Sequence, residues 1–194
     1  MIATYKFIQT YFHNGELAYT GPELRPHFIL QKFGIEGSSL AAFIGPCDVQ
    51  TEHLVDWEDR LQNDSIRAKS MVHFLGEFFG LSLAEGVWIQ RLIVSELAQR
   101  LKVSREGDDL FHTTAAGDRL KLSVSIVTAS PVSVLLHLGV NIDATGAPVK
   151  AGGLKDLGYS SPDSIKKLVV DLLQWFETEY QSVARACVKV RPVV

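Results

Sequence analysis

The 194-residue chain, with 46% hydrophobic and 21% charged residues, has the size and composition of a globular protein, and we expect residues 1–194 to form a single domain. Its formal net charge of −3 gives no general attraction to nucleic acid or anionic lipid, and no apolar run is long enough to span a bilayer, so neither nucleic acid nor a membrane is expected as a partner. Two cysteines far apart indicate no disulfide framework, and without a basic-then-apolar leader we expect a cytoplasmic protein.

The first half of the chain mixes strand and helix signals. Asn14-Gly15 between two alternating segments predicts a β-hairpin, and Pro22 and Gly34 are start and stop signals for a short helix. The expected elements, in order, are hairpin strands at 4–12 and 16–19, a helix at 22–34 whose start Pro26 delays or kinks, a strand at 39–44 ended by Gly45-Pro46, an acidic connector at 48–59, and a helix at 64–79 capped by Asp64 and stopped by Gly80.

Amphipathic periodicity and capping signals predict two more helices in the second half. Residues 87–101 carry one apolar stripe, and Ser161-Pro162-Asp163 combines a cap, a first-turn proline and an acid at the start of a long helix. The other expected elements are a strand at 107–112, a hairpin within 120–142, a Gly-rich connector at 146–153 and a short edge strand at 188–190. Strands that arrive as hairpins, without regular β-α alternation, predict an α+β fold with a mainly antiparallel sheet and helices packed on one face.

The predicted hairpin at 120–142 is the most informative segment because one of its faces is polar. Side chains alternate along a strand, and directly opposed residues of an antiparallel pair share a face. A turn centred near Pro131 then places three residues of the first strand beside three of the second, namely Lys121, Ser123 and Ser125 beside His137, Gly139 and Asn141. Val124, Ile126, Leu136 and Val140 are expected to face packed helices. Small residues and donor–acceptor groups suit the floor of a ligand site, and a solvated outer face is the alternative.

Standard nucleotide and metal motifs are missing from the sequence. It contains no Gly-x-Gly-x-x-Gly turn, no phosphate loop ending in Gly-Lys-Ser/Thr, no Cys-x-x-Cys pair and no His-Glu-x-x-His helix. We therefore expect no metal ligands among the site residues. The cofactor stays unknown, with ATP and magnesium left open as ligands of an atypical site.

Two groups of acidic residues have a plain and a functional interpretation. Asp56, Glu58 and Asp59, with Asp48 before them, predict a solvated acidic loop, and a shared cation is the alternative. Gly107-Asp108-Asp109 predicts a turn that enters a strand.

The predicted helix at 64–79 carries three further candidates. His73 and Glu77 are four residues apart and would meet on one flank of a helix. Arg67 lies in a similar arc, where an unpaired buried charge would be costly. We expect a carboxylate of the acidic connector to pair with Arg67, and an anionic ligand is the alternative.

Several sequence blocks resemble the family catalogued as domain of unknown function 366. They occur in order along nearly the full length, and the resemblance implies a fold similar to the biotin and lipoate protein ligases and to the catalytic domain of class II aminoacyl-tRNA synthetases. It implies no activity. The blocks are Gly45-Pro46-Cys47-Asp48-Val49, Val55-Asp56-Trp57-Glu58-Asp59, Met71-Val72-His73-Phe74 with Glu77, Gln90-Arg91-Leu92, Gly107-Asp108-Asp109-Leu110 and residues 121–141.

The hairpin by itself resembles that of the biotin ligases. Lys121 matches a lysine that opens a strand there, and Gly139 and Asn141 match the end of a Gly-x-Gly-x-Asn motif. This resemblance implies that Lys121 contacts an acyl carboxylate and the activated phosphate, where a fixed cation stabilises developing negative charge. His137 replaces the first glycine of the motif, and the phosphate loops of the biotin and lipoate ligases are absent.

Two functional hypotheses follow. In the first, the protein is an enzyme of the acyl-ligase or acyltransferase type that acts on a small carboxylate or adenylate-type ligand. Its catalytic residues would be Lys121 and His137, and its ligand-binding residues would be Ser123, Ser125, Gly139, Asn141, Arg67 and His73. In the second, a non-catalytic protein keeps the fold and binds a small molecule. Both leave the substrate, any acceptor protein and the oligomeric state open.

Overall fold

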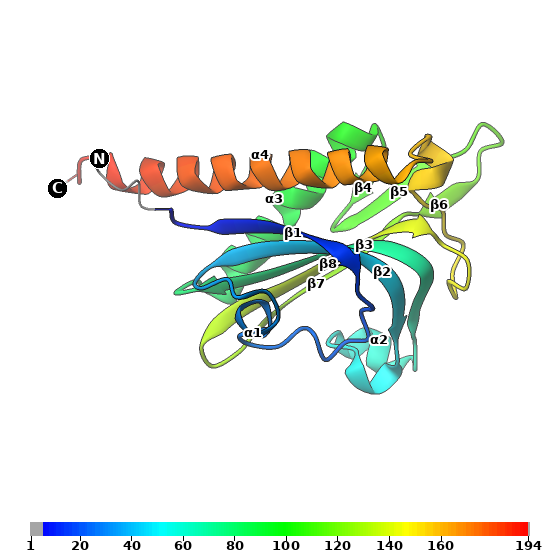
Figure 1. Cartoon of the computed structure of the whole chain (residues 1–194), viewed down its shortest axis with the longest axis horizontal. Helices are drawn as coiled ribbons and strands as arrows, with labels where there is room; N and C mark the ends of the chain where they lie inside the picture. Colours follow the sequence, from blue (N-terminus) through cyan, green and yellow to red (C-terminus); the bar gives the residue numbers. More distant parts are fainter. Residues whose placement is uncertain (1–5, 194) are drawn as a thin grey trace.

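The computed structural model describes residues 6–193, and its elements alternate between strands and helices in an irregular order (Figure 1). In chain order they are β1 Gln9–Glu16, α1 Phe28–Phe33, β2 Ser39–Val49, the 3-10 turn η1 Thr51–His53, α2 Trp57–Leu61, β3 Ile66–Phe79, α3 Leu83–Leu101, β4 Ser104–Glu106, β5 Asp109–Thr113, β6 Arg119–Lys121, β7 Ser123–Ala129, β8 Ser133–Asp143, the 3-10 turn η2 Leu154–Leu157 and α4 Pro162–Val188.

A five-stranded sheet in the order β1-β2-β3-β8-β7 forms the centre of the molecule. Only its β1–β2 pair is parallel among the strand pairs of residues 6–193. A smaller antiparallel sheet, β4-β5-β6, lies beside it. The fold is therefore α+β with a mainly antiparallel sheet, as the sequence predicts.

The two long helices cover one face of the large sheet (Figure 1). Apolar residues of α3 and α4, such as Ile93, Leu97 and Phe176, pack there against strand residues such as Phe74 and Leu138. A second apolar cluster lies on the opposite face, the side on which the short helices α1 and α2 are found. Among the described residues, no helix is both long and apolar enough to cross a membrane.

The predicted helix at 64–79 is wrong, because this segment is the central strand β3. β3 pairs with β2 on one side and with β8 on the other, and its residues 71–78 are buried on both faces. A strand buried on both faces has a continuous apolar run, and such a run cannot be distinguished from a buried helix by periodicity.

The predicted N-terminal hairpin is also wrong; its residues 4 and 5 lie outside the described residues. β1 runs straight through Asn14-Gly15 and pairs in parallel with β2, and a register shift between Phe12 and Glu16 accommodates this stretch. β2 likewise continues beyond Gly45-Pro46, with a bulge between Gly45 and Cys47. The glycine-containing pairs therefore mark bulges rather than turns.

The start of α4 was predicted correctly from its capping signals, whereas α3 begins at Leu83, four residues before the predicted start. Ser82 forms a capping box with Glu85 at the start of α3, and Ser161 caps α4, whose first residue is Pro162. α4 continues to Val188, so the predicted edge strand at 188–190 is wrong. α1 ends before Gly34 as expected but begins only at Phe28, after Pro26.

Candidate functional site

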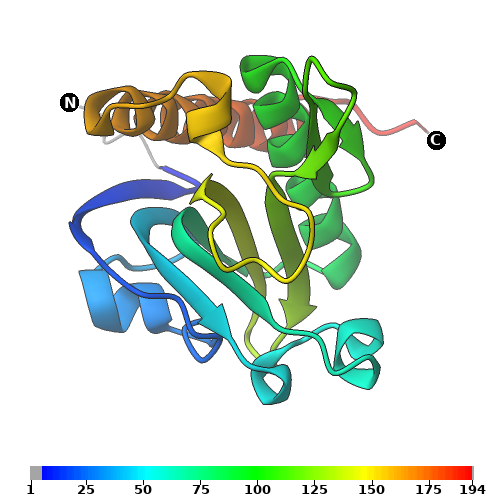
Figure 2. The same cartoon turned by 90° about the vertical axis from the view of Figure 1, so that its right-hand side faces the viewer.

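A cavity of about 380 Å³ lies between the hairpin β7–β8, the segment from η1 to the start of β3, and the loop after β8; we call it the hairpin pocket. The last two segments lie on the side of the molecule shown in Figure 2, in cyan and yellow. The polar residues that line the pocket are Asp56, Asp59, Asp64, Ser65, Arg67, Asp108, Asp109, Lys121, Ser123, Ser125, His137 and Asn141.

The register of the hairpin differs by one residue from the prediction. Ser123 lies opposite Val140 and Ser125 opposite Leu138, whereas His137 lies opposite Ile126. The turn is centred between Pro131 and Val132, because the backbone N–H of Ser130 donates to the carbonyl of Ser133, 2.8 Å away. A shift of one residue moves every side chain to the other face, so Val124 and Ile126, not the serines, share the face of His137.

Both serines nevertheless line the pocket, because β7 is the outermost strand of its sheet. Ser123 Oγ accepts the backbone N–H of Leu110 at 2.9 Å. Ser125 Oγ donates to Asp108 Oδ2 at 2.9 Å and accepts from Gln90 Nε2 at 2.8 Å. These bonds hold the edge strand against the small sheet and α3.

Two predicted site residues, Gly139 and His73, do not line the pocket. A Cβ on Gly139 would lie 2.6 Å from the Met71 Cε, so the glycine gives room to Met71. His73 lies beneath the pocket floor, fully buried between β2 and β8.

His73 and Glu77 do not meet, in contrast to the helical prediction. Residues four apart on a strand are separated by about 13 Å. Glu77 instead accepts hydrogen bonds from the backbone N–H of His27 and from Ser133 Oγ, at 2.9 and 2.8 Å. This buried carboxylate ties the segment before α1 to the start of β8.

His73 fixes the protonation pattern of His137. His73 Nδ1 is 3.2 Å from His137 Nε2, and His73 Nε2 is 3.3 Å from the Gly45 carbonyl oxygen. A carbonyl only accepts, so His73 carries its proton on Nε2. Burial lowers the pKa of His73 to about 4, and burial and then the neighbouring His73 lower the pKa of His137, so both rings are neutral.

The neutral His73 therefore accepts at Nδ1, and His137 donates from Nε2. His137 Nδ1 keeps its lone pair, and it has no hydrogen-bond partner within residues 6–193. The Tyr19 ring stacks on His137 at 3.7 Å between ring centroids and holds the imidazole in place. The pocket floor thus presents a fixed hydrogen-bond acceptor.

Asn141 presents a second acceptor. It is only 7% exposed, and its Nδ2 donates to the carbonyl of Gly152 at 3.0 Å. Its Oδ1 makes no hydrogen bond to another described residue.

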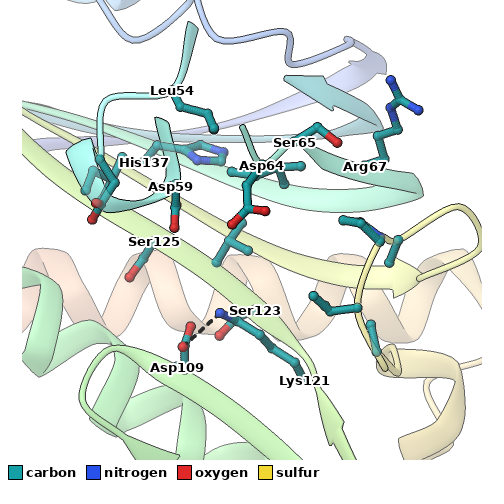
Figure 3. A pocket seen from close by; sticks show the side chains of 18 of the residues that line it. Leu54, Asp59, Asp64, Ser65, Arg67, Asp109, Lys121, Ser123, Ser125 and His137 are labelled. Atoms are coloured by element: carbon teal, nitrogen blue, oxygen red, sulfur yellow. Dashed lines mark ion pairs between the residues drawn. The ribbon is translucent and has the colours of Figure 1, made fainter. Parts of the chain in front are cut away.

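The two cations of the pocket are already paired with carboxylates. Lys121 Nζ is 2.8 Å from Asp109 Oδ2 (Figure 3), and Arg67 Nε is 3.0 Å from Asp48 Oδ1. The second pair confirms the predicted pairing of Arg67 with a carboxylate of the acidic connector.

Asp59 and Asp64 have no ion-pair partner in the part of the chain that the structure describes. Both point into the space between His137 and the Lys121–Asp109 pair (Figure 3). Desolvation first, and then the charges of Asp56 and Asp64, raise the pKa of Asp59. No group of three or more His, Cys, Asp or Glu side chains that could hold a metal ion occurs among residues 6–193.

Sequence reasoning missed Asp64, Asp108 and Asp109 as pocket residues. Asp64 was expected to cap a helix, and Asp108 and Asp109 to form a plain turn, which they do at the entry to β5. The polar pair Gln90-Arg91 on α3 was the signal that could have pointed to Asp108. Gln90 is a buried amide whose Nε2 donates to Asp108 Oδ2 at 3.1 Å, and Arg91 forms an ion pair with the same aspartate at 3.1 Å.

The model of the family described as Domain of unknown function (DUF366) matches residues 8–191. The chain belongs to this family. An uncharacterized protein of Methanocaldococcus jannaschii is 29% identical to the DUF366 chain over 173 residues, covering 84% of this chain and 76% of the relative. A solved protein of unknown function from Pyrococcus horikoshi is 32% identical, with a TM-score of 0.85 over 96% of this chain and 100% of that one.

More distant solved structures share the fold of the DUF366 chain. A mutant biotin protein ligase from Aquifex aeolicus in complex with biotin is 12% identical, with a TM-score of 0.52 over 89% of this chain and 70% of that one. A bipartite lipoate protein ligase from Thermoplasma acidophilum is 10% identical, with a TM-score of 0.53 over 87% and 82%. The fold is that of the biotin and lipoate ligases, as the sequence resemblance implies.

Proposed function

We propose that this DUF366 protein binds a small molecule in the hairpin pocket. The supporting observation is that His137 and Asn141, 2% and 7% exposed, each keep an acceptor without a partner among residues 6–193 at a cavity of about 380 Å³. Neither acceptor atom is fully buried, since Ser39 Oγ is the only fully buried side-chain N or O atom without a partner among the described residues. Both acceptors are therefore open to a donor group that enters the cavity. Pockets of roughly 300–1,000 Å³ are the usual size for small-molecule ligands.

Acyl activation is the second candidate function, and the position of Lys121 in the pocket favours it. In this alternative Lys121 would hold a carboxylate or phosphate, His137 would act as an acid or base, and Ser123 and Asn141 would orient the ligand. Lys121 would first have to leave Asp109. ATP fits the residues present poorly, because phosphates require donors and the unpaired groups of the pocket are acceptors.

A thermal-shift screen separates the two functions. ATP, magnesium and acyl acids are added singly and together, and release of pyrophosphate is followed in parallel. Binding without acyl activation predicts stabilisation by some small molecules and no pyrophosphate. Stabilisation by ATP plus an acid, with pyrophosphate release, would establish the acyl-activating enzyme instead.

Lys121→Ala tests the role of the lysine directly. If Lys121 holds an anionic ligand, the change weakens binding of the best acid from the screen by about 10- to 100-fold in calorimetric titration, because a charge-assisted contact is lost. Lys167→Ala is the matched control, since Lys167 pairs with Asp171 on α4. Equal acid affinity of wild type and Lys121→Ala would remove Lys121 from the binding site.

A further inference from the structure

The hairpin pocket is acidic. Five aspartates line it, against one lysine and one arginine. Lys121 is paired with Asp109 and Arg67 with Asp48, so each cation of the pocket already shares its charge with a carboxylate. Asp59 and Asp64 have no ion-pair partner among the described residues.

The uncharged polar groups of the floor have the same preference. His137 Nδ1 and Asn141 Oδ1 are both acceptors without a partner in the described part of the chain. The hydrogen bond to His73 fixes the first, and the hydrogen bond to Gly152 fixes the second. Both side chains are more than nine-tenths buried and line the cavity. A ligand that satisfies these acceptors must donate hydrogen bonds.

The pocket also has an apolar wall. Val124 and Ile126 line it on the face of β7 that they share with His137, and Leu54 and Met71 line it as well. A short carbon chain would bury its methylene groups against these side chains.

We propose that the ligand of the hairpin pocket is a small alkyl amine, whose ammonium group lies between Asp59 and Asp64 and donates to His137 Nδ1. This inference rests on the proposed small-molecule function. Desolvation and like-charged neighbours make Asp59 a carboxylate that favours either a proton or a cation, and this agrees with its raised pKa.

Three fragments with the same carbon chain test the charge preference. n-Butylamine, n-butanol and n-butyrate are titrated at neutral pH, and amide chemical shifts of the pocket residues are followed by NMR. We expect n-butylamine to shift amides at Asp59, Asp64 and His137 with at least about ten-fold higher affinity than the other two, because only the ammonium makes charge-assisted hydrogen bonds.

Variants then assign the effect to the pocket carboxylates. Asp59→Asn and Asp64→Asn should each weaken n-butylamine about ten-fold. Glu58→Gln, an exposed carboxylate on α2 that does not line the pocket, should leave it unchanged. Lys121→Met should strengthen it, since Asp109 loses its partner and becomes a further free carboxylate. If the pocket instead binds acids through Lys121, the Lys121→Met change should weaken binding of the fragment that the pocket prefers.

The outcomes separate this inference from the proposed function. If n-butyrate shifts the pocket amides more than n-butylamine, or if n-butanol equals n-butylamine, the amine ligand is refuted and small-molecule binding stands. If none of the three fragments shifts the pocket amides, the amine ligand is refuted, and the thermal-shift screen alone decides the proposed function.

Discussion

The buried histidines link the chemistry of the site to the stability of the protein. His73 and His137 are 0% and 2% exposed, and burial is the first cause of the lowered pKa of each. In the unfolded chain both rings return to a pKa near 6.5. The unfolded state therefore binds more protons than the folded state below that pH.

We predict that the free energy of unfolding is highest above about pH 6.5 and falls as the pH drops towards 4. His73 alone accounts for about 3 kcal/mol over this window, since its pKa falls from 6.5 to about 4 and each unit corresponds to about 1.4 kcal/mol. His137 adds to the loss in the same direction. Urea unfolding at a series of pH values measures this decrease in the free energy of unfolding.

The double variant His73→Phe, His137→Phe is the control for this prediction. It removes both partners of the His73–His137 hydrogen bond together, so neither ring nitrogen of that bond is left without its partner. Its free energy of unfolding should depend much less on pH between 6.5 and 4. An unchanged pH dependence would show that other groups cause the acid sensitivity.

At the scale of single residues, the sequence identified the hairpin side of the pocket better than the opposite side. Lys121, His137 and Asn141 were found because their alternation is a local property of one segment. Asp64 and Asp109 reach the pocket only through the packing of distant elements, and nothing in their neighbouring residues indicates it. The hairpin register was wrong because it depends on one residue in the turn.

At the scale of elements, α3 packs closely against the hairpin that floors the pocket. A Cβ on Gly86 would collide with Val134 Cγ1 and lie 2.9 Å from Val127 Cγ1. Val134 is buried and stiff at its first side-chain torsion, so it cannot turn aside. Gly86 therefore lets the helix approach β7 and β8 closely.

Gly86→Ala should destabilise the protein by about 1–3 kcal/mol through overpacking, although alanine favours a helix over glycine by about 1 kcal/mol. Denaturant unfolding measures the change. Ser95→Ala, at an exposed position of the same helix, should shift the free energy of unfolding by no more than about 0.5 kcal/mol. A stabilising Gly86→Ala would mean that α3 can move away from the sheet without cost.

Element prediction succeeded where the signals are local and failed where strand pairing is distant. Ser161 caps α4 within its own first turn, so the sequence contains the whole signal for this start. The capping box of Ser82 is equally local, but the predicted helix at 87–101 left it out. β3 has its partners in β2 and β8, and the latter is more than fifty residues away along the chain. The apolar run of β3 reflects its position between two strands, with an apolar cluster on each face of the sheet. This tertiary context decides that the segment is a strand, although its local pattern also fits a helix.

At the scale of the whole molecule, one sheet is shared by two apolar clusters. The cluster under α3 and α4 includes Phe176 with Trp175 packed against it, and the cluster on the other face includes Cys47 and Phe43. Both clusters draw residues from β2 and β3. Loss of the sheet would expose both faces at once, so we propose that residues 1–194 unfold as a single domain.

Two probes on opposite faces of the sheet test this proposal. Trp175 fluorescence, in a variant with Trp57→Phe and Trp88→Phe, reports the helix-covered face. Thiol labelling of Cys47, in the same variant with Cys187→Ser, reports the other face, because Cys47 is 3% exposed and burial raises its pKa to about 12. In the native state Cys47 is therefore both shielded and protonated at neutral pH.

We expect the two probes to give the same midpoint in a urea titration, as a two-state transition requires. Far-UV circular dichroism on the same variant supplies a third curve for the sheet and helices together. Phe176→Ala, which opens a cavity on the helix-covered face, should lower the free energy of unfolding by about 3–5 kcal/mol. Because the sheet is common to both faces, this change should move the Cys47 labelling curve as far as the Trp175 curve. A shift confined to Trp175 would divide the chain into two independently unfolding parts.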